Sequence, residues 1–279
     1  MNTSGKAPRV GAVKQITSHA NPIVKEIKGL IAQRKHRTQS GLFVAEGLKL
    51  ATDALEAGWD VRYLALGPEA RENPIAQQAA ASAKARGALI LEVNTAILSA
   101  MTRKDNPQMV VGVYEQKTAS LSNIDPNSAS TWVALDRVRD PGNLGTVIRT
   151  IDAVGASGVV LVGDCTDPFA VETVRATMGS LFHVPIVKTA KAAFLDFAKN
   201  WPGPVVGTHL EGSVDYRTAD YAEPVLLLMG NEQQGLDASM TGVCKTLIRI
   251  PQIGQADSLN LAVATGITLY EIRRNHLEL

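Results

Sequence analysis

Cysteine, aromatic residues and long apolar runs are all scarce in this chain of 279 residues. Its two cysteines, Cys165 and Cys244, lack the spacing of zinc ligands, and so few thiols are typical of a reducing compartment. No apolar run is long enough to cross a membrane, and the N-terminus does not have the pattern of a signal peptide. We therefore expect a cytoplasmic protein with no metal site, no disulfide framework and no membrane partner.

The scarcity of aromatic residues also decides the kind of core. Aromatic side chains make up 5% of the chain and hydrophobic residues as a whole make up 45%. The cores must therefore be built from Val, Leu, Ile and Ala. The length is sufficient for two domains, each with a core of its own.

The net charge of +1 conceals an uneven distribution. Residues 1–40 contain eight lysines and arginines, including Lys6 and Arg9, against one acidic residue, Glu26. A basic end on an otherwise acidic chain indicates contact with a polyanion, although a solvated helix face gives the same pattern. The candidate RNA-binding residues are Lys28, Arg34, Lys35 and Arg37.

The first 115 residues have the pattern of a small α/β domain. Residues 1–15 are polar and basic and are interpreted as a frayed tail. Asn21 followed by Pro22 predicts the start of a helix with an apolar stripe. The pattern predicts further helices at 48–57, 75–86 and 95–101, and strands at 61–66, 88–93 and 110–114.

Residues 116–130 have the composition of a linker, and the alternation of strand and helix restarts at residue 131. Apolar strands separated by helices predict a mainly parallel sheet with helices on both faces, in which ligands bind beyond the carboxyl ends of the strands. The predicted strands are 131–136, 158–162, 185–188, 204–208, 224–229 and 247–250, and the predicted helices are 144–154, 170–178, 190–200 and 259–273.

The first informative segment runs from Asp136 to Arg149, from a strand end into a helix. Gly142 and Gly145 allow a tight turn, and Asn143 can cap the helix or form a hydrogen bond with a substrate. Arg149 lies one turn beyond Gly145. A dinucleotide-binding loop is disfavoured because the required G-x-G-x-x-G is absent.

Two later segments also follow strands. In the first of them, an apolar strand leads into Gly230, which indicates close approach of another backbone or a ligand, and Glu232 follows two residues later. In the second, a strand stops at Pro251, and Ser258 is the expected N-cap of the last helix, with Asn260 in its first turn. Taken alone, each segment is compatible with a purely structural turn.

The order of the three segments is more specific than any one of them. N-x-G-x-x-x-R at 143–149, G-N-E-x-x-G-L at 230–236 and I-P-x-x-G-x-x-x-S-L-N-L-A-V-A at 250–264 resemble the three motifs of the SpoU (TrmH) family of SPOUT methyltransferases. The resemblance covers roughly residues 130–275. I-T-S-x-x-N-P at 16–22 and G-L-F-V-A-E-G at 41–47 are similar to the substrate-binding domain of ribosomal-RNA members.

The resemblance implies transfer of a methyl group from S-adenosyl-L-methionine (AdoMet) to a ribose 2′-hydroxyl in RNA. It implies an RNA substrate-binding domain at 1–115 and a homodimeric α/β methyltransferase domain at 131–279 with a trefoil knot. It places the cofactor at Thr208, Gly230, Ile250 and Leu259. It places the catalytic site at Arg149, Asn143, Glu232, Ser258 and Asn260. Gln252 stands where the family usually has Met.

Within that family Arg149 is the proposed proton acceptor. A guanidinium with a pKa above about 12 is a poor base, which favours a role in placing a phosphate and polarising the hydroxyl. A non-catalytic RNA-binding protein and a dinucleotide-dependent dehydrogenase are the alternatives in other classes. Among RNA substrates, 23S ribosomal RNA is preferred over transfer RNA because of the N-terminal domain.

Overall fold

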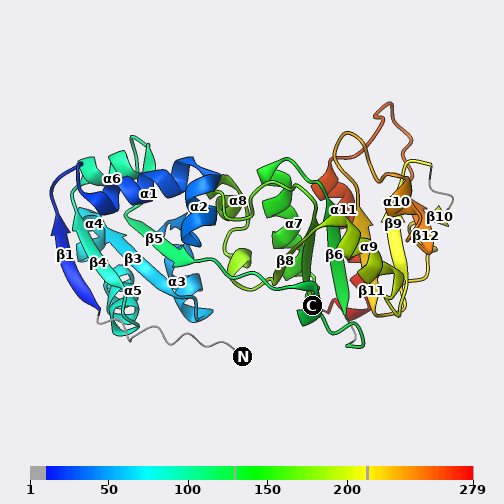
Figure 1. Cartoon of the computed structure of the whole chain (residues 1–279), viewed down its shortest axis with the longest axis horizontal. Coiled ribbons are helices and arrows are strands. Elements are labelled where there is room, and N and C mark those ends of the chain that lie inside the picture. The colour runs from blue at the N-terminus through cyan, green and yellow to red at the C-terminus, as the bar shows by residue number, and fades with distance from the viewer. Residues whose placement is uncertain (1–10, 129, 212–213, 279) are drawn as a thin grey trace. The chain divides into compact units, whose positions relative to one another are not determined.

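A computed structural model describes residues 11–128, 130–211 and 214–278 of the chain (Figure 1). Lys6 and Arg9 lie outside these described residues. The chain forms two compact units. Unit 1 comprises residues 1–116 with 169–175, and unit 2 comprises residues 117–168 with 176–279. Each unit contains one sheet, so the prediction of two α/β domains is confirmed.

Unit 1 is built on a five-stranded sheet in the order β1-β4-β3-β5-β2, in which only β5 runs against its neighbours. Figure 1 shows α1 and α6 on one face of the sheet and α3 and α5 on the other. The elements of this unit are β1 (Ala12–Ile16), α1 (Pro22–Ala32), α2 (Arg34–Ser40), β2 (Leu42–Glu46), α3 (Leu48–Glu56), β3 (Val61–Leu66), α4 (Pro68–Glu72), α5 (Pro74–Ala85), β4 (Leu89–Val93), α6 (Thr95–Thr102) and β5 (Val110–Glu115).

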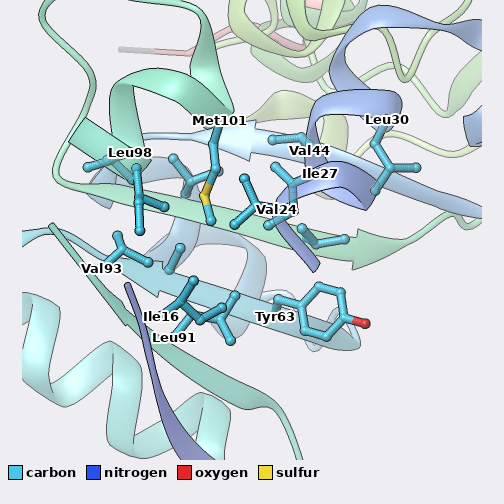
Figure 2. Close-up of a cluster of buried hydrophobic side chains, with 14 of the residues drawn as sticks. Ile16, Val24, Ile27, Leu30, Val44, Tyr63, Leu91, Val93, Leu98 and Met101 are labelled. Atoms are coloured by element: carbon cyan, nitrogen blue, oxygen red, sulfur yellow. The ribbon is translucent and has the colours of Figure 1, made fainter. Parts of the chain in front are cut away.

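Helix α1 begins at the Asn21-Pro22 pair, as the sequence predicted. The Asn21 side chain accepts a hydrogen bond from the Ile23 amide at 2.9 Å, and Pro22 occupies the first helical position. The buried stripe of α1 packs with α6 and the strands into an aliphatic core (Figure 2). The residues labelled there are Ile16, Val24, Ile27, Leu30, Val44, Tyr63, Leu91, Val93, Leu98 and Met101.

The prediction of a tail up to residue 15 is wrong for its last part. Residues 12–16 form β1, an edge strand that pairs in parallel with β4. Its burial pattern explains the error, because only Ile16 is buried and the other four residues are exposed. An edge strand with one buried side chain has no alternating pattern for the sequence to show.

Unit 2 contains a seven-stranded sheet in the order β10-β12-β9-β11-β6-β7-β8, and every pair in it is parallel. Its elements are η1 (Leu121–Asn123), β6 (Thr131–Asp136), α7 (Pro141–Ala153), β7 (Gly158–Val162), α8 (Val171–Ala176, shared with unit 1), η2 (Ser180–Phe182), β8 (Ile186–Thr189), α9 (Lys191–Lys199), β9 (Val205–Thr208), β10 (Val214–Asp215), β11 (Val225–Met229), α10 (Ala238–Thr241), β12 (Thr246–Arg249), α11 (Leu261–Arg273) and η3 (Arg274–His276).

Both faces of this sheet are covered, as a parallel sheet requires. Trp132 and Ala134 of β6 belong to a core with α9 and α10, whereas Val133 and Leu135, which point the other way, are completely buried as well. The register sets Met229 beside Leu135 and Ile248 beside Thr208. The carboxyl ends of β6, β9, β11 and β12 therefore lie at one edge, where the three informative segments begin.

The boundaries between the units differ from those predicted. The expected linker is 116–130, and from Lys117 onward it belongs to unit 2, where Ala119 forms a bridge with Val187. Residues 169–175 belong to unit 1, where the ring of Phe169 is fully buried 5.0 Å from that of Phe43. An apolar side chain in a loop shows no periodicity, so nothing in the sequence assigns it to a core outside its own domain.

Candidate active site

The first loop of the site begins helix α7 earlier than predicted. Asp140, not Asn143, is the N-cap, because its carboxylate accepts a hydrogen bond from the Asn143 amide at 2.6 Å and Pro141 takes the first helical position. Asn143 therefore lies inside the first turn. Its side chain is left available for contacts with the other two loops.

Glu232, from the loop after β11, accepts hydrogen bonds at the start of α7. Its carboxylate lies 3.2 Å from the Arg139 amide, 3.1 Å from the Asp140 amide and 3.3 Å from Asn143 Nδ2. A carboxylate at a helix N-terminus is favoured by the helix dipole and by the N–H groups that lack a partner within the helix. Glu232 thus joins the second loop to the first.

Asn260 joins the third loop to Asn143 in the first turn of α7. Its Nδ2 donates to Asn143 Oδ1 at 2.9 Å, while its Oδ1 accepts from the amides of Ala262 and Val263. Asn260 is therefore the N-cap of α11, and the prediction that Ser258 is the cap is wrong. Ser258 is exposed and forms no hydrogen bond with the described residues. A serine and an asparagine that can each cap a helix cannot be ranked from sequence alone.

Gly230 lies where the loop after β11 leaves no room for a side chain. A Cβ on Gly230 would lie 2.3 Å from the Gly235 carbonyl carbon and 2.4 Å from the Leu236 nitrogen. The loop closes on itself there, through paired backbone hydrogen bonds between Asn231 and Gly235. The close approach is that of the loop backbone, which is the first of the two alternatives that the sequence offered for Gly230.

A charged cluster beside this site was not identified from sequence. Asp136 is 1% exposed and accepts a hydrogen bond from Arg137 Nη2 at 2.8 Å. Arg137 also donates to Gln234 Oε1 at 3.0 Å and has a left-handed backbone with φ of 52°. Lys191 and Ser239 donate to Asp237 and hold the pKa of its carboxyl well below the usual range. The only sign of this cluster in the sequence was an acidic residue, Asp136, at the end of a strand.

Arg149 is the predicted site residue that the three linked loops do not include. It is exposed on α7 and has no hydrogen bond or ion pair with the described residues. It follows Asn143 by six residues, which is about 9 Å along a helix axis. Its guanidinium is therefore available to a group that approaches from solvent.

The predicted cofactor residues lie at the ends of neighbouring strands. Thr208 ends β9, Gly230 follows β11 and Ile250 follows β12, while Leu259 immediately precedes the cap of α11. Leu210 and Ile253, which follow β9 and β12, are 58% and 103% exposed. Exposed apolar side chains next to backbone groups at strand ends suit a ligand with a flat ring, such as adenine, so these residues fit AdoMet.

The four basic residues named as RNA-binding candidates in unit 1 differ in their exposure. Arg34 and Lys35 are exposed and Lys28 is half-buried. Arg37 is only 5% exposed, because its Nη1 donates to the carbonyl oxygen of Leu30 at 2.7 Å and joins α2 to α1. The sequence named Arg37 among the RNA-binding candidates because it shows charge but not burial.

Two features are absent from the part of the chain that the structure describes. No group of three or more His, Cys, Asp or Glu side chains lies close enough together to hold a metal ion. None of the helices there combines the length and the hydropathy that a bilayer crossing requires.

Comparison with known proteins identifies the class and then the family. Residues 130–270 match the SpoU rRNA Methylase family, and residues 21–112 match the MRM3-like substrate binding domain. Together with the parallel sheet and the three linked loops, these matches define an AdoMet-dependent RNA 2′-O-methyltransferase. The chain belongs to the SpoU rRNA Methylase family, and the resemblance in the three motifs is confirmed.

Individual relatives match nearly the whole chain. The 23S rRNA (guanosine(2553)-2′-O)-methyltransferase RlmP of Bacillus subtilis is 33% identical, over 94% of this chain and 100% of the relative. The 23S rRNA (uridine(2479)-2′-O)-methyltransferase of Streptomyces viridochromogenes is 31% identical, over 98% and 96%. The structure of an AdoMet-bound rRNA methyltransferase from Sinorhizobium meliloti is 55% identical, with a TM-score of 0.89 and coverage of 95% and 99%.

Proposed function

We propose that this enzyme methylates the 2′-hydroxyl of one ribose in 23S ribosomal RNA. The observation that carries the proposal is the continuous hydrogen-bonded connection from Glu232 through Asn143 to Asn260, which assembles all three motifs at one edge of the sheet. The choice of 23S ribosomal RNA is supported by the printed substrates of two relatives that match the chain almost from end to end.

The chemistry sets three requirements on the residues at this edge. AdoMet supplies a methyl group that its sulfonium already activates. The protein must place the ribose oxygen in line with that methyl group and must stabilise the hydroxyl as its proton passes to water. In this proposal Thr208, Gly230, Ile250 and Leu259 hold the cofactor by backbone contacts, and Ser258 and Asn260 border the ribose.

Arg149 supplies orientation in this proposal, and no proton transfer. Its planar guanidinium can hold a phosphate oxygen and a hydroxyl in fixed directions, and its pKa above about 12 keeps it charged throughout. Glu232 and Asn143 act as positioning residues, because the carboxylate and both ends of the amide already form hydrogen bonds inside the protein.

We place Arg149 at the interface of a homodimer. Val263 and Tyr270, seven residues apart on one face of α11, are 50% and 52% exposed. α11 packs on α7, and a Cβ on Gly266 would lie 3.9 Å from Thr150 Cγ2, next to Arg149. In this proposal a second copy of the chain covers this apolar stripe. The RNA bound at the dimer interface then lies next to Arg149. Light scattering tests the proposed homodimer, and a monomer at micromolar concentration would contradict it.

Unit 1 is the RNA-binding unit in this proposal. Lys28, Arg34 and Lys35 supply phosphate contacts, and Arg37 supports the helices that carry them. Neutralising these first three residues lowers the affinity similarly for different RNA sequences, and each lost phosphate contact reduces the slope of log affinity against log salt by about 0.7–0.9. An unchanged slope would show that these side chains only face solvent.

The remaining parts of the proposal are the trefoil knot and the cytoplasmic location. The knot is supported by the path of the chain, which leaves β12 beside β9 and returns to pack α11 against α7, the helix that follows β6. The cytoplasm is the compartment in which bacterial ribosomal RNA is found.

Mapping 2′-O-methylation in RNA from cells with and without the gene tests the proposed function. The expected result is one position in 23S ribosomal RNA that loses its methyl group in the deletion strain and regains it on complementation. Loss of a methyl group from transfer RNA alone would replace the proposed substrate. No difference in any RNA would leave a protein that binds RNA without modifying it.

A further inference from the structure

Glu46 of unit 1 has a carboxylate with one oxygen that accepts no hydrogen bond from the described residues. The side chain is 4% exposed, and its Oε2 accepts from Lys104 and from Arg175, the latter at 3.2 Å. Its Oε1 is buried without a hydrogen-bond partner. A buried carboxylate oxygen normally has a donor, and leaving one without a donor costs free energy, so this atom indicates a ligand.

The position of Glu46 in the fold supports that indication. β1, β2, β3 and β4 run in one direction, so their carboxyl ends lie at one edge of the sheet together with the start of β5. Glu46 ends β2 at this edge, and Lys104 lies in the loop that leads to β5. Lys28, Arg34 and Lys35 come from the last part of α1 and from α2, which precedes β2, so they lie toward the opposite edge.

Helix α3 begins at Leu48, two residues after Glu46, with an N-terminus that no side chain caps. Gly47 is its N-cap residue, whereas α1, α5 and α6 are each capped by an asparagine. The first-turn N–H groups of α3 lack partners within the helix and favour an anion such as phosphate. Two cations share one carboxylate here, so Glu46, Lys104 and Arg175 together carry a net charge of +1.

We propose that Glu46, Lys104, Arg175 and the first turn of α3 form a second RNA contact site, which binds one nucleotide of the substrate. Lys104 and Arg175, whose side chains are 30% and 59% exposed, turn toward the phosphate and thereby uncover the carboxylate. Oε1 of Glu46 then accepts a hydrogen bond from the same nucleotide, donated either by its ribose hydroxyl or by an exocyclic amino group of its base. The proposal rests on the proposed function, because it assumes an RNA substrate.

The phosphate contact is tested by Lys104→Gln in the full-length enzyme. The KM for a methyl-accepting fragment of 23S ribosomal RNA rises about five- to tenfold, kcat stays unchanged, and the salt slope falls by about the value of one phosphate contact. Lys84→Gln, an exposed lysine at the far end of α5 in the same unit, is the matched control and leaves all three values unchanged. Equal effects of the two variants would overturn the phosphate contact.

The contact with Glu46 is tested by a double-mutant cycle with the RNA. Single 2′-deoxy and single base-amine substitutions across the fragment, outside the methylated nucleotide, identify the groups whose loss weakens binding to the wild-type enzyme. For one of these groups, the RNA substitution must no longer weaken binding when the enzyme is Glu46→Met, because methionine has no oxygen acceptor. A deoxy position identifies the ribose hydroxyl, and a base position identifies the amine.

Folding and function are controlled separately in this cycle. Glu46→Gln keeps an oxygen acceptor and retains part of the coupling, so it replaces Glu46→Met if that variant does not fold. If the wild-type enzyme methylates the fragment, but the effect of the Glu46 substitution on binding is additive with the effect of every RNA substitution, the proposed site is overturned. A wild-type enzyme that does not methylate it would instead contradict the proposed function.

Discussion

Asn260 Nδ2 donates a hydrogen bond to Asn143 Oδ1 at 2.9 Å, and this bond joins two segments that are 117 residues apart in sequence. Each amide has its orientation fixed by its other partner. Asn143 Nδ2 donates to Glu232, and Asn260 Oδ1 accepts from the first turn of α11. The three motifs are therefore connected through side chains whose donors and acceptors cannot be exchanged.

Asn260→Asp separates the two roles of this residue. An aspartate still caps α11, but it cannot donate to Asn143 and places a carboxylate oxygen against an amide oxygen. We expect a folded protein with kcat/KM lowered about 10- to 100-fold, which corresponds to about 1–3 kcal/mol. Steady-state kinetics and thermal unfolding measure the two effects, and wild-type kcat/KM would show that the bond between the asparagines has no part in the reaction.

Gly230→Ala forces the loop after β11 to move. Its Cβ would meet backbone atoms of Gly235 and Leu236, which cannot give way as the end of a side chain can. We expect a loss of stability of about 1–3 kcal/mol together with weaker AdoMet binding. Gly254→Ala, whose Cβ meets no atom within 4 Å, is the control for stability. Weaker AdoMet binding without any loss of stability would show that the added Cβ meets the ligand and not the loop backbone.

Arg149→Ala should abolish methyl transfer and leave the affinity for AdoMet nearly unchanged, because Arg149 lies outside the linked loops and the strand ends assigned to the cofactor. An interaction used mainly in the transition state affects kcat. Arg149→Lys should restore little activity, since lysine keeps the charge but has no planar fork. Calorimetry and single-turnover kinetics distinguish the outcomes, and a large loss of AdoMet affinity in Arg149→Ala would contradict the assignment.

Both cysteines should react slowly with alkylating reagents at neutral pH. Burial raises the pKa of the Cys165 thiol to about 11 and that of Cys244 to about 12, so at pH 7 almost none of either thiol is in the reactive thiolate form. We expect iodoacetamide labelling of the native enzyme to be much slower than labelling in denaturant, with the rate rising as the pH approaches 11. Equal rates in the two states would contradict the burial.

The sequence predicted most of the elements because their signals are local. An asparagine before a proline begins α1, and unbroken apolar runs form the buried strands of unit 2, such as β7 and β11. The order of the three motifs identified the family, and the parallel sheet explains why they meet.

The sequence could not show features that depend on tertiary contacts. The burial of Arg37, the edge strand β1 and the placement of Phe169 in unit 1 all arise from neighbours distant in sequence. Likewise, the choice of Asn260 over Ser258 as a cap depends on its partner Asn143, and the unsatisfied oxygen of Glu46 is visible only in three dimensions.

The central claim, methylation of a ribose oxygen, is tested most directly on a 23S ribosomal RNA fragment in which only the mapped nucleotide lacks its 2′-hydroxyl. Every base atom remains available in this fragment, so it separates a ribose acceptor from a base acceptor. Transfer of labelled methyl from AdoMet is measured for the deoxy fragment and its unmodified counterpart. The account predicts transfer to the unmodified fragment alone, and continued transfer to the deoxy fragment would contradict it.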